Sequence, residues 1–250
     1  IDPLCRTDVE PKTLIMGDSF AMHLVPALLE DPQVSLIQFT KSTCPAAFHL
    51  GFYEPPRFGR RHAESCLANN HLAVDFAVQQ QSLETVIIAA AWIYQFDTAQ
   101  VLMQTGQDIG LVPNSELLFM QDMRALVSRL RAAGKRVVIV GAPPGQLNDA
   151  AKCNVRKKLG LLRMGKGLDC KILESSERER RARSDALLLE LQESGIPVFW
   201  FYDAFCPNGV CVTEKEGVIL YRDFGHLSIE GSRYLGRELN LYDTLLELAR

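Results

Sequence analysis

Long apolar runs are absent from this sequence. The longest, residues 86–94, is far shorter than the roughly 18 apolar residues of a transmembrane helix. It has the length of a buried strand and the loop that leaves it. A secretory leader and a starting Met are also missing, since the chain opens Ile1-Asp2-Pro3. We therefore expect a soluble piece of a longer protein.

A strong charge of either sign is lacking as well. The formal net charge is −3, which argues against nucleic acid as a partner. Hydrophobic residues make up 47% of the 250 positions, enough to bury one sizeable core. No composition shift or low-complexity linker divides the chain. We expect one domain over residues 1–250, with residues 1–12 as a linker-like extension.

Metal-binding cysteine patterns are missing although cysteine itself is plentiful. None of the seven cysteines forms Cys-x-x-Cys, and no histidine lies at zinc-finger spacing. The spacing thus argues against a structural metal, and we expect neither a metal nor another cofactor. Three loop-closing disulfides in an oxidising compartment fit the spacings, with Cys5 left over, and cysteines scattered by chance are the alternative. The predicted pairs are Cys44–Cys66, Cys153–Cys170 and Cys206–Cys211.

No Gly-x-Ser-x-Gly elbow occurs, which counts against the α/β-hydrolase fold. A different serine turn is present. A short apolar run ends in Gly17-Asp18-Ser19, and an amphipathic stretch follows at once. This order indicates strand, tight turn and helix, and it places the Ser19 hydroxyl in the crevice where open α/β sheets bind ligands. A plain helix N-cap serine is the alternative.

The rest of the chain alternates between strands and helices. Short apolar segments of this kind suit parallel strands that are covered on both faces. The sequence therefore predicts an α/β fold of three α/β/α layers, with a five-stranded doubly wound parallel sheet. Strands are expected at residues 13–17, 34–40, 85–91, 136–141 and 197–202, and helices at 21–29, 64–81, 115–133, 176–194 and 229–248.

A second chemical motif lies near the other end of the chain. Asp223 and His226 are three residues apart, just before a helix that Ser228 can cap. In one turn, the carboxylate would accept from one imidazole nitrogen while the other nitrogen faces a nucleophile. A capping Asp beside a surface His is the alternative. The combination with Gly17-Asp18-Ser19 is much rarer than either motif alone.

This combination resembles the SGNH (GDSL-like) hydrolases, whose fold is flavodoxin-like. The closest resemblance is to the SGNH domain fused to acyltransferase-3 membrane proteins, which O-acetylate bacterial surface glycans. It extends over nearly the whole chain. Its landmarks are Gly17-Asp18-Ser19, Thr43-Cys44-Pro45, Cys66, Ala91-Trp92-Ile93-Tyr94, Cys206 to Cys211, and Asp223-Phe224-Gly225-His226-Leu227-Ser228.

The resemblance implies a catalytic triad of Ser19, His226 and Asp223. The Ser19 N–H would be one oxyanion donor, and the loop after the second strand, with Ser42 preferred, would supply another. General SGNH hydrolases carry an oxyanion Asn after the third strand. Trp92 stands there in this chain. Its indole either donates or only walls the pocket. His23 is expected to be a packed helix histidine.

Three irregular segments, residues 45–62, 95–113 and 147–173, leave the carboxyl ends of strands and should overhang the crevice. The first carries the expected substrate-binding residues Phe52, Tyr53 and Arg57, although loop packing is an equal alternative.

The predicted function is that of an O-acetyltransferase. An acetyl-Ser19 ester would pass its acetyl group to a hydroxyl of a lipopolysaccharide O-antigen or a related polysaccharide. The expected partners are an acetyl donor, a glycan acceptor and a membrane acyltransferase-3 domain in the same chain. The expected location is the periplasmic face of the bacterial inner membrane. A carbohydrate acetylesterase that uses water is the first alternative, and a non-catalytic carbohydrate-binding module is the second.

Overall fold

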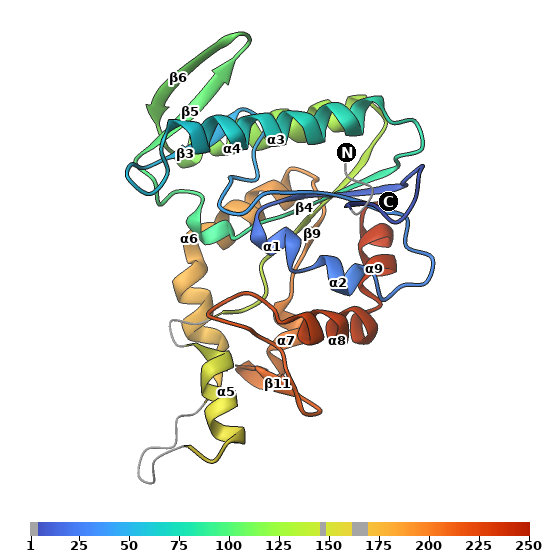
Figure 1. Ribbon diagram of the computed structural model, residues 1–250, viewed down its shortest axis with the longest axis vertical. Helices are drawn as coiled ribbons and strands as arrows, with labels where there is room; N and C mark the ends of the chain where they lie inside the picture. The colour runs from blue at the N-terminus through green and yellow to red at the C-terminus, as the bar shows by residue number, and fades with distance from the viewer. Residues whose placement is uncertain (1–4, 146–148, 162–169) are drawn as a thin grey trace.

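The computed structural model describes residues 5–145, 149–161 and 170–250. Its centre is a five-stranded parallel sheet with the spatial order β2-β1-β4-β7-β9 (Figure 1). Successive strands lie on opposite sides of β1, so the order reverses between β1 and β4, where doubly wound sheets bind their ligands. The predicted fold class is confirmed. The strands are β1 (Thr13–Gly17), β2 (Leu36–Thr40), β4 (Thr85–Ala89), β7 (Arg136–Val140) and β9 (Val198–Phe199).

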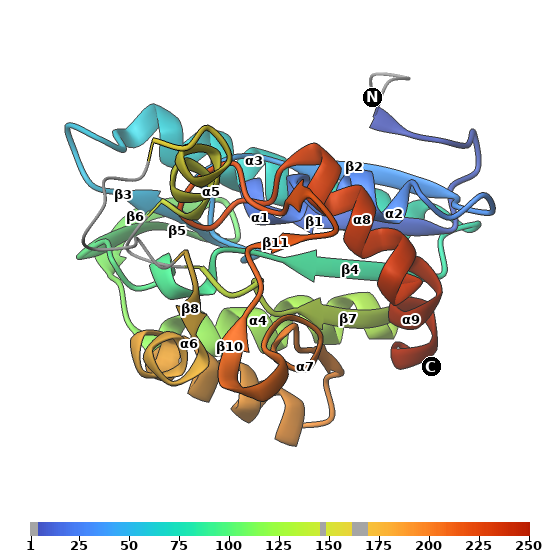
Figure 2. The same ribbon diagram turned by 90° about the horizontal axis from the view of Figure 1, so that it is seen from below.

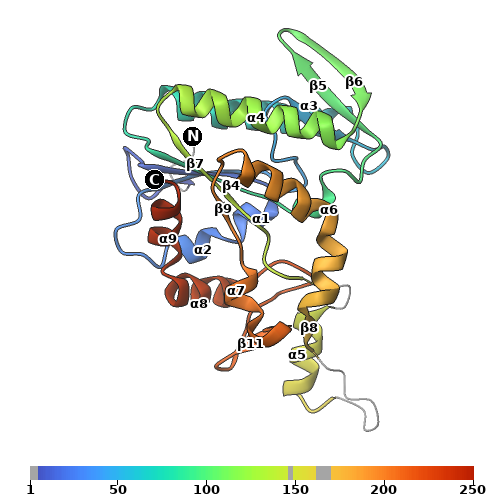
Figure 3. The same cartoon turned by 180° about the vertical axis from the view of Figure 1, so that it is seen from behind.

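Helices cover both faces of this sheet because side chains alternate along each strand. Leu14 and Met16 of β1 belong to one apolar cluster, whereas Ile15 belongs to the cluster on the opposite face. Figures 1 and 3 show helices α3, α4 and α6 on the first side, and Figure 2 shows α2, α8 and α9 across the second. The helices are α1 (Ser19–Met22), α2 (Val25–Leu28), α3 (Arg60–Gln79), α4 (Glu116–Ala132), α6 (Glu174–Glu193), α7 (Tyr202–Phe205), α8 (Ile229–Leu239) and α9 (Leu241–Leu248).

Two predicted helices are each broken in two. The segment 21–29 divides into α1 and α2, with Pro26 in the first turn of α2. Proline cannot continue a helix from the preceding turn, because it lacks the N–H and its ring meets the carbonyl four residues back. The segment 229–248 divides at Asn240, whose φ of 44° is left-handed. Asparagine tolerates this conformation better than most residues.

The irregular segments contain structure that the sequence did not predict. Segments 45–62 and 95–113 together build an antiparallel sheet of order β3-β5-β6. Its hairpin projects beyond α3 and α4, whereas α5 projects at the opposite end of the molecule (Figures 1 and 3). These and the remaining short elements are β3 (Leu50–Tyr53), η2 (Trp92–Tyr94), β5 (Gln100–Thr105), β6 (Asp108–Pro113), α5 (Ala150–Lys158), β8 (Ile172–Leu173), η3 (Pro207–Gly209), β10 (Val210–Cys211), β11 (Glu214–Lys215) and β12 (Val218–Ile219).

The expected N-terminal extension, residues 1–12, contacts the sheet. Residues 1–4 lie outside the described residues. Arg6 forms an antiparallel bridge with Ile37, and the Thr7 N–H donates to the Leu36 carbonyl oxygen at 2.9 Å. Residues 6 and 7 therefore cover the edge of β2, which protects an otherwise open strand edge.

All three predicted disulfides are present: Cys44–Cys66, Cys153–Cys170 and Cys206–Cys211. Cys5 is a free cysteine. Within the described ranges, no helix is both long and apolar enough to cross a lipid bilayer.

Candidate active site

Ser19 follows a turn that depends on glycine. Gly17 ends β1 with φ +136°, and a Cβ at this position would lie 1.8 Å from the carbonyl oxygen of Ala89. Only glycine permits both the dihedral and this close approach. Asp18 then caps α1 by accepting from the Phe20 N–H at 2.7 Å, and it also accepts from the Ala91 N–H at 2.9 Å. The turn that carries Ser19 is thereby joined to the end of β4.

The second motif forms the compact turn that the sequence predicts. The Asp223 carboxylate accepts from the Gly225 and His226 N–H groups at 3.1 and 2.8 Å. The Ser228 hydroxyl caps α8 by accepting from the Gly231 N–H at 2.9 Å. The turn is held in addition by a bridge between Tyr221 and Leu227. His226 is thus fixed immediately before a capped helix.

These two turns bring Ser19, His226 and Asp223 into one hydrogen-bonded line. His226 Nε2 lies 2.7 Å from Ser19 Oγ, and Nδ1 lies 3.0 and 2.9 Å from the two Asp223 carboxylate oxygens. Because a carboxylate only accepts, Nδ1 carries the proton and donates to Asp223. Nε2 is then the acceptor for the Ser19 hydroxyl. This is the geometry of a nucleophile, a base and an orienting acid.

The pKa values of two carboxyl groups near Ser19 are shifted in opposite directions. Burial alone would raise the pKa of Asp223, but the N–H groups of His226 and Gly225 and the neighbouring imidazole hold that pKa below its usual value. For Asp18, burial prevails over the hydrogen bonds from Ala91 and Phe20 and raises the pKa to about 6. Asp223 therefore stays ionised over the neutral range, whereas Asp18 titrates in mildly acidic solution.

His23 packs beneath the turn of His226, as expected for a packed helix histidine. Its ring centroid lies 5.8 Å from that of His226, and its Nδ1 accepts from the Leu227 N–H at 3.2 Å. Burial holds the pKa of His23 well below its usual value, and the neighbouring His226 and Arg222 lower it further. A neutral His23 therefore supports the turn without adding charge.

The expected oxyanion loop places Thr43, and not Ser42, beside Ser19. Both residues are exposed, but Thr43 lines the cavity that contains Ser19 and Ser42 does not. Thr43 has φ 60°, a left-handed conformation that is uncommon for a β-branched residue. Among the described residues, the Thr43 N–H has no hydrogen-bond acceptor. This N–H is the better candidate for the second donor.

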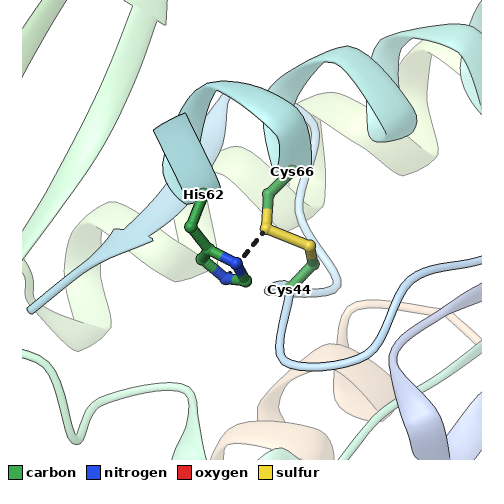
Figure 4. Close-up of side chains that lie close together, drawn as sticks. All are labelled: Cys44, His62 and Cys66. Atoms are coloured by element: carbon green, nitrogen blue, oxygen red, sulfur yellow. Dashed lines mark hydrogen bonds between the residues drawn. A yellow bond between two sulfur atoms is a disulfide. The ribbon is translucent and has the colours of Figure 1, made fainter. Parts of the chain in front are cut away.

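A disulfide and a histidine hold the Thr43 loop. Cys44 is bonded to Cys66 of α3, and His62 Nε2 lies 3.4 Å from Cys66 Sγ and 3.1 Å from the Thr43 carbonyl oxygen (Figure 4). Among the described residues, Cys44, His62 and Cys66 are also the one group whose potential ligand atoms lie close enough together to hold a metal ion. A disulfide offers no thiolate, which is the form of cysteine that binds metal. In the oxidised protein this group fastens the loop.

Trp92 does not take the place of the missing oxyanion Asn. Its indole N–H donates to the Val140 carbonyl oxygen at 2.8 Å, and its side chain is buried. Trp92 is therefore a wall of the site, which is one of the two alternatives that the sequence left open.

The expected substrate residues of segment 45–62 divide between the cavity and the core. Phe52, Arg57 and Phe58 line the cavity of Ser19, whereas Tyr53 does not. Phe48 packs into the main apolar cluster. Sequence reasoning named the loop of Thr43 but preferred Ser42 within it. It missed Asp185 and Phe224, which line a second cavity beside His226. Asp185 gave no signal, because it belongs to a helix rich in charge.

We compared the chain with known proteins. Its residues 1–240 match the family described as SGNH domain (fused to AT3 domains). Among solved structures, the periplasmic domain of a lipopolysaccharide acetyltransferase from Salmonella ser. Paratyphi A has a TM-score of 0.64 at 16% identity, with 94% of this chain and 84% of that chain covered. A putative platelet activating factor from Streptococcus pneumonia has a TM-score of 0.49 at 12% identity, with coverages of 94% and 85%. No curated protein matches the sequence.

The family match places the chain in the SGNH class, and the fold is the one that this class has. More narrowly, it belongs to the family of SGNH domains that are fused to AT3 domains, so the resemblance predicted from its motifs is confirmed.

Proposed function

We propose that this chain is an O-acetyltransferase domain that moves an acetyl group through Ser19 to a hydroxyl of a bacterial surface glycan. The observation that carries this proposal is the hydrogen-bonded line from Ser19 Oγ through His226 to Asp223. Such a line activates a hydroxyl that is otherwise a weak nucleophile at neutral pH.

In the first half of the reaction, Ser19 Oγ attacks the carbonyl carbon of an acetyl ester while His226 Nε2 takes the hydroxyl proton. Asp223 stabilises the imidazolium and keeps its orientation. The N–H groups of Ser19 and Thr43 would face the oxyanion, and the intermediate collapses as Nε2 returns the proton to the leaving oxygen. Acetyl-Ser19 remains.

The second half repeats these steps with an acceptor hydroxyl. The acceptor loses its proton to His226, its oxygen bonds to the acetyl carbon, and the Ser19 Oγ–carbon bond breaks. The proton then returns to Ser19 Oγ. Each proton taken is given back, so the triad needs neither a metal nor an organic cofactor.

Family membership supports the proposed setting of this chemistry. Because related SGNH domains are fused to AT3 domains, we place an AT3 domain in the same chain as the membrane partner that delivers the acetyl group. The structural relative is the periplasmic domain of a lipopolysaccharide acetyltransferase. By analogy, the proposed acceptor is a lipopolysaccharide O-antigen or a related polysaccharide, at the periplasmic face of the inner membrane.

The second candidate is a carbohydrate acetylesterase. Water and a sugar hydroxyl compete for the same acetyl-Ser19, so the triad serves either reaction. Which one prevails depends on how well the acceptor is bound and water is excluded.

The test is to trap the intermediate. Mixing the 250-residue chain with p-nitrophenyl acetate and quenching within one turnover should give a peptide with the mass of one added acetyl group on Ser19. Ser19→Ala should lack this adduct and the burst of p-nitrophenol. An adduct on another residue, with turnover intact in Ser19→Ala, would disprove the acyl-serine route.

A further inference from the structure

His226 borders two cavities. The first, here called the Ser19 cavity, has a volume of about 310 Å³ and is lined by Ser19, Thr43, Phe52 and Phe58 among others. The second, here called the Phe224 cavity, has a volume of about 430 Å³ and is lined by Trp92, Arg180, Asp185 and Phe224 among others. Phe20, Ala91, Tyr94 and His226 border both. Both cavities therefore reach His226.

The positive charges of the Phe224 cavity are already paired. Arg180 donates to the two oxygens of Glu177 at 2.9 and 2.7 Å. Arg181 pairs with Glu177 as well and donates to the carbonyl oxygens of Ala142 and Pro143 at 2.6 Å each. Asp185 and Asp223 add two carboxylates to the lining. Among the described residues that line this cavity, an anionic ligand would meet these carboxylates with no uncommitted guanidinium to offset them, so the lining favours an uncharged ligand.

The remaining lining combines exposed rings with fixed polar groups. Tyr94 and Phe224 are 51% and 56% exposed although both are large and apolar. The Asp185 carboxylate accepts from the Tyr202 hydroxyl at 2.8 Å, which orients it, and Ser184 lies beside it on α6. Aromatic faces suit the C–H faces of a pyranose, and an oriented carboxylate accepts from its hydroxyls.

The Ser19 cavity differs from the Phe224 cavity in its lining residues. It contains the nucleophile and Thr43, so the acetyl carbonyl of an acyl-enzyme belongs on this side. Ser19 is not among the residues that line the Phe224 cavity, whereas His226 is. An acceptor in the Phe224 cavity would thus reach the base without displacing the acetyl group.

We propose that the Phe224 cavity is the acceptor site, where an uncharged sugar ring stacks on Tyr94 or Phe224 and presents one hydroxyl to His226. This inference rests on the proposed acetyl-Ser19 intermediate. The sugar hydroxyl gives its proton to His226 Nε2 while its oxygen bonds to the acetyl carbon. The bond from that carbon to Ser19 Oγ then breaks, and the proton returns to Ser19 Oγ.

The experiment measures how acetyl is divided between water and sugar. The chain receives p-nitrophenyl acetate together with neutral methyl hexosides or the anionic methyl glucuronide, and acetate and acetylated glycoside are quantified. We expect transfer to neutral glycosides to saturate and to exceed transfer to the glucuronide. Phe224→Ala and Asp185→Asn should each raise the half-saturating glycoside concentration by about tenfold or more, and direct a larger share of acetyl to water.

Two comparison variants sharpen the assignment. Arg57→Ala, in the Ser19 cavity, should alter the use of p-nitrophenyl acetate without changing the half-saturating glycoside concentration. Leu117→Ala, an exposed residue of α4 outside both cavities, should change neither quantity. Circular dichroism and thermal melting check that each variant folds, and Asp185→Asn replaces Phe224→Ala if the latter does not fold.

The outcomes separate this inference from the proposed function. If Ser19→Ala abolishes the burst but the folded variant at position 224 or 185 transfers to glycoside like the wild type, the acceptor site is wrong and the acyl-enzyme stands. The acceptor site is equally wrong if no glycoside diverts acetyl from water, or if the glucuronide is preferred. If Ser19→Ala keeps the burst, the proposed function itself fails.

Discussion

The indole N–H of Trp92 donates to the carbonyl oxygen of Val140, so the one side-chain donor of the residue that we expected at the oxyanion position points into the sheet. A donor cannot serve a buried carbonyl and a developing oxyanion together. Trp92 therefore acts as a wall, and the work of oxyanion stabilisation is left to N–H groups near Ser19.

This assignment predicts the behaviour of Trp92→Phe. The variant keeps most of the wall and leaves the buried Val140 carbonyl oxygen without its donor, which should lower the free energy of unfolding by about 1–3 kcal/mol. We expect kcat for p-nitrophenyl acetate to fall by less than about tenfold. Loss of a true oxyanion donor costs about 10²–10³ in kcat, so a fall of that size would return Trp92 to the oxyanion site.

The hydrogen bonds between His226 and Asp223 predict a graded set of losses. Ser19→Ala and His226→Ala should abolish measurable turnover of p-nitrophenyl acetate. Asp223→Asn should lower kcat by up to about 10⁴, because an amide that donates to Nδ1 selects the wrong imidazole tautomer. Asp203→Asn, a surface change on α7, is the matched control and should keep wild-type kcat.

Much of the fold could be predicted because the central strands are buried on both faces. The apolar runs of β1, β4 and β7 predict such strands directly. The hairpin of β5 and β6 could not be predicted in this way. Its outer strand β6 is mostly exposed, and polar residues lie at both ends of β5, so neither strand is a continuous buried apolar run. Its partner β3 comes from a distant segment, and the local pattern of apolar residues does not predict which distant segments pair.

The site residues likewise fall into those that the sequence predicts and those that it does not. Ser19, Asp223 and His226 could be predicted because each lies in a short local motif. Asp185 and Phe224 could not, since the cavity that they share arises only when α6 packs beside the turn of His226. The segment 45–62 was expected to be an irregular loop that overhangs the crevice. It supplies β3 and buries Phe48, so single substitutions are the appropriate probes of it.

The oxyanion loop gives a prediction that separates a backbone donor from a hydroxyl. Thr43→Val keeps the N–H and the β-branched shape but loses the hydroxyl, and Ser42→Ala removes the hydroxyl that the sequence favoured. If the Thr43 N–H is the donor, both variants should keep kcat for p-nitrophenyl acetate within about threefold, against about 10²–10³ for a lost donor. A loss near 10² in Ser42→Ala would restore Ser42 to that role.

The disulfides supply a matched pair of variants. Replacing both members of Cys44–Cys66 or of Cys153–Cys170 by Ala should lower stability by about 3 kcal/mol in each case, since the two bridges span 22 and 17 residues. Only the first bridge fastens the Thr43 loop. We therefore expect kcat for p-nitrophenyl acetate to fall severalfold in the first variant at a temperature where both are folded, and to be unchanged in the second. Equal kcat values would mean that the loop holds its shape without the bridge.

Asp18 predicts a pH dependence of stability with a definite sign. Burial raises the pKa of this carboxyl from 3.8 to about 6, so the folded protein binds its proton more tightly than the unfolded chain does. Its contribution to stability is then fully present below pH 3.8 and is lost as the pH rises through about 6. A pKa shift of this size corresponds to about 3 kcal/mol in the free energy of unfolding.

The matched variant for this effect is Asp18→Asn, which cannot titrate. Urea unfolding of both proteins between about pH 3.5 and about pH 7.5 therefore isolates the contribution of the carboxyl group. The wild type should lose stability relative to Asp18→Asn across this window by up to about 3 kcal/mol, because the buried carboxylate becomes charged. A difference that stays constant, or one that grows in favour of the wild type as the pH rises, would show that the hydrogen bonds from Phe20 and Ala91 outweigh the burial of the charge.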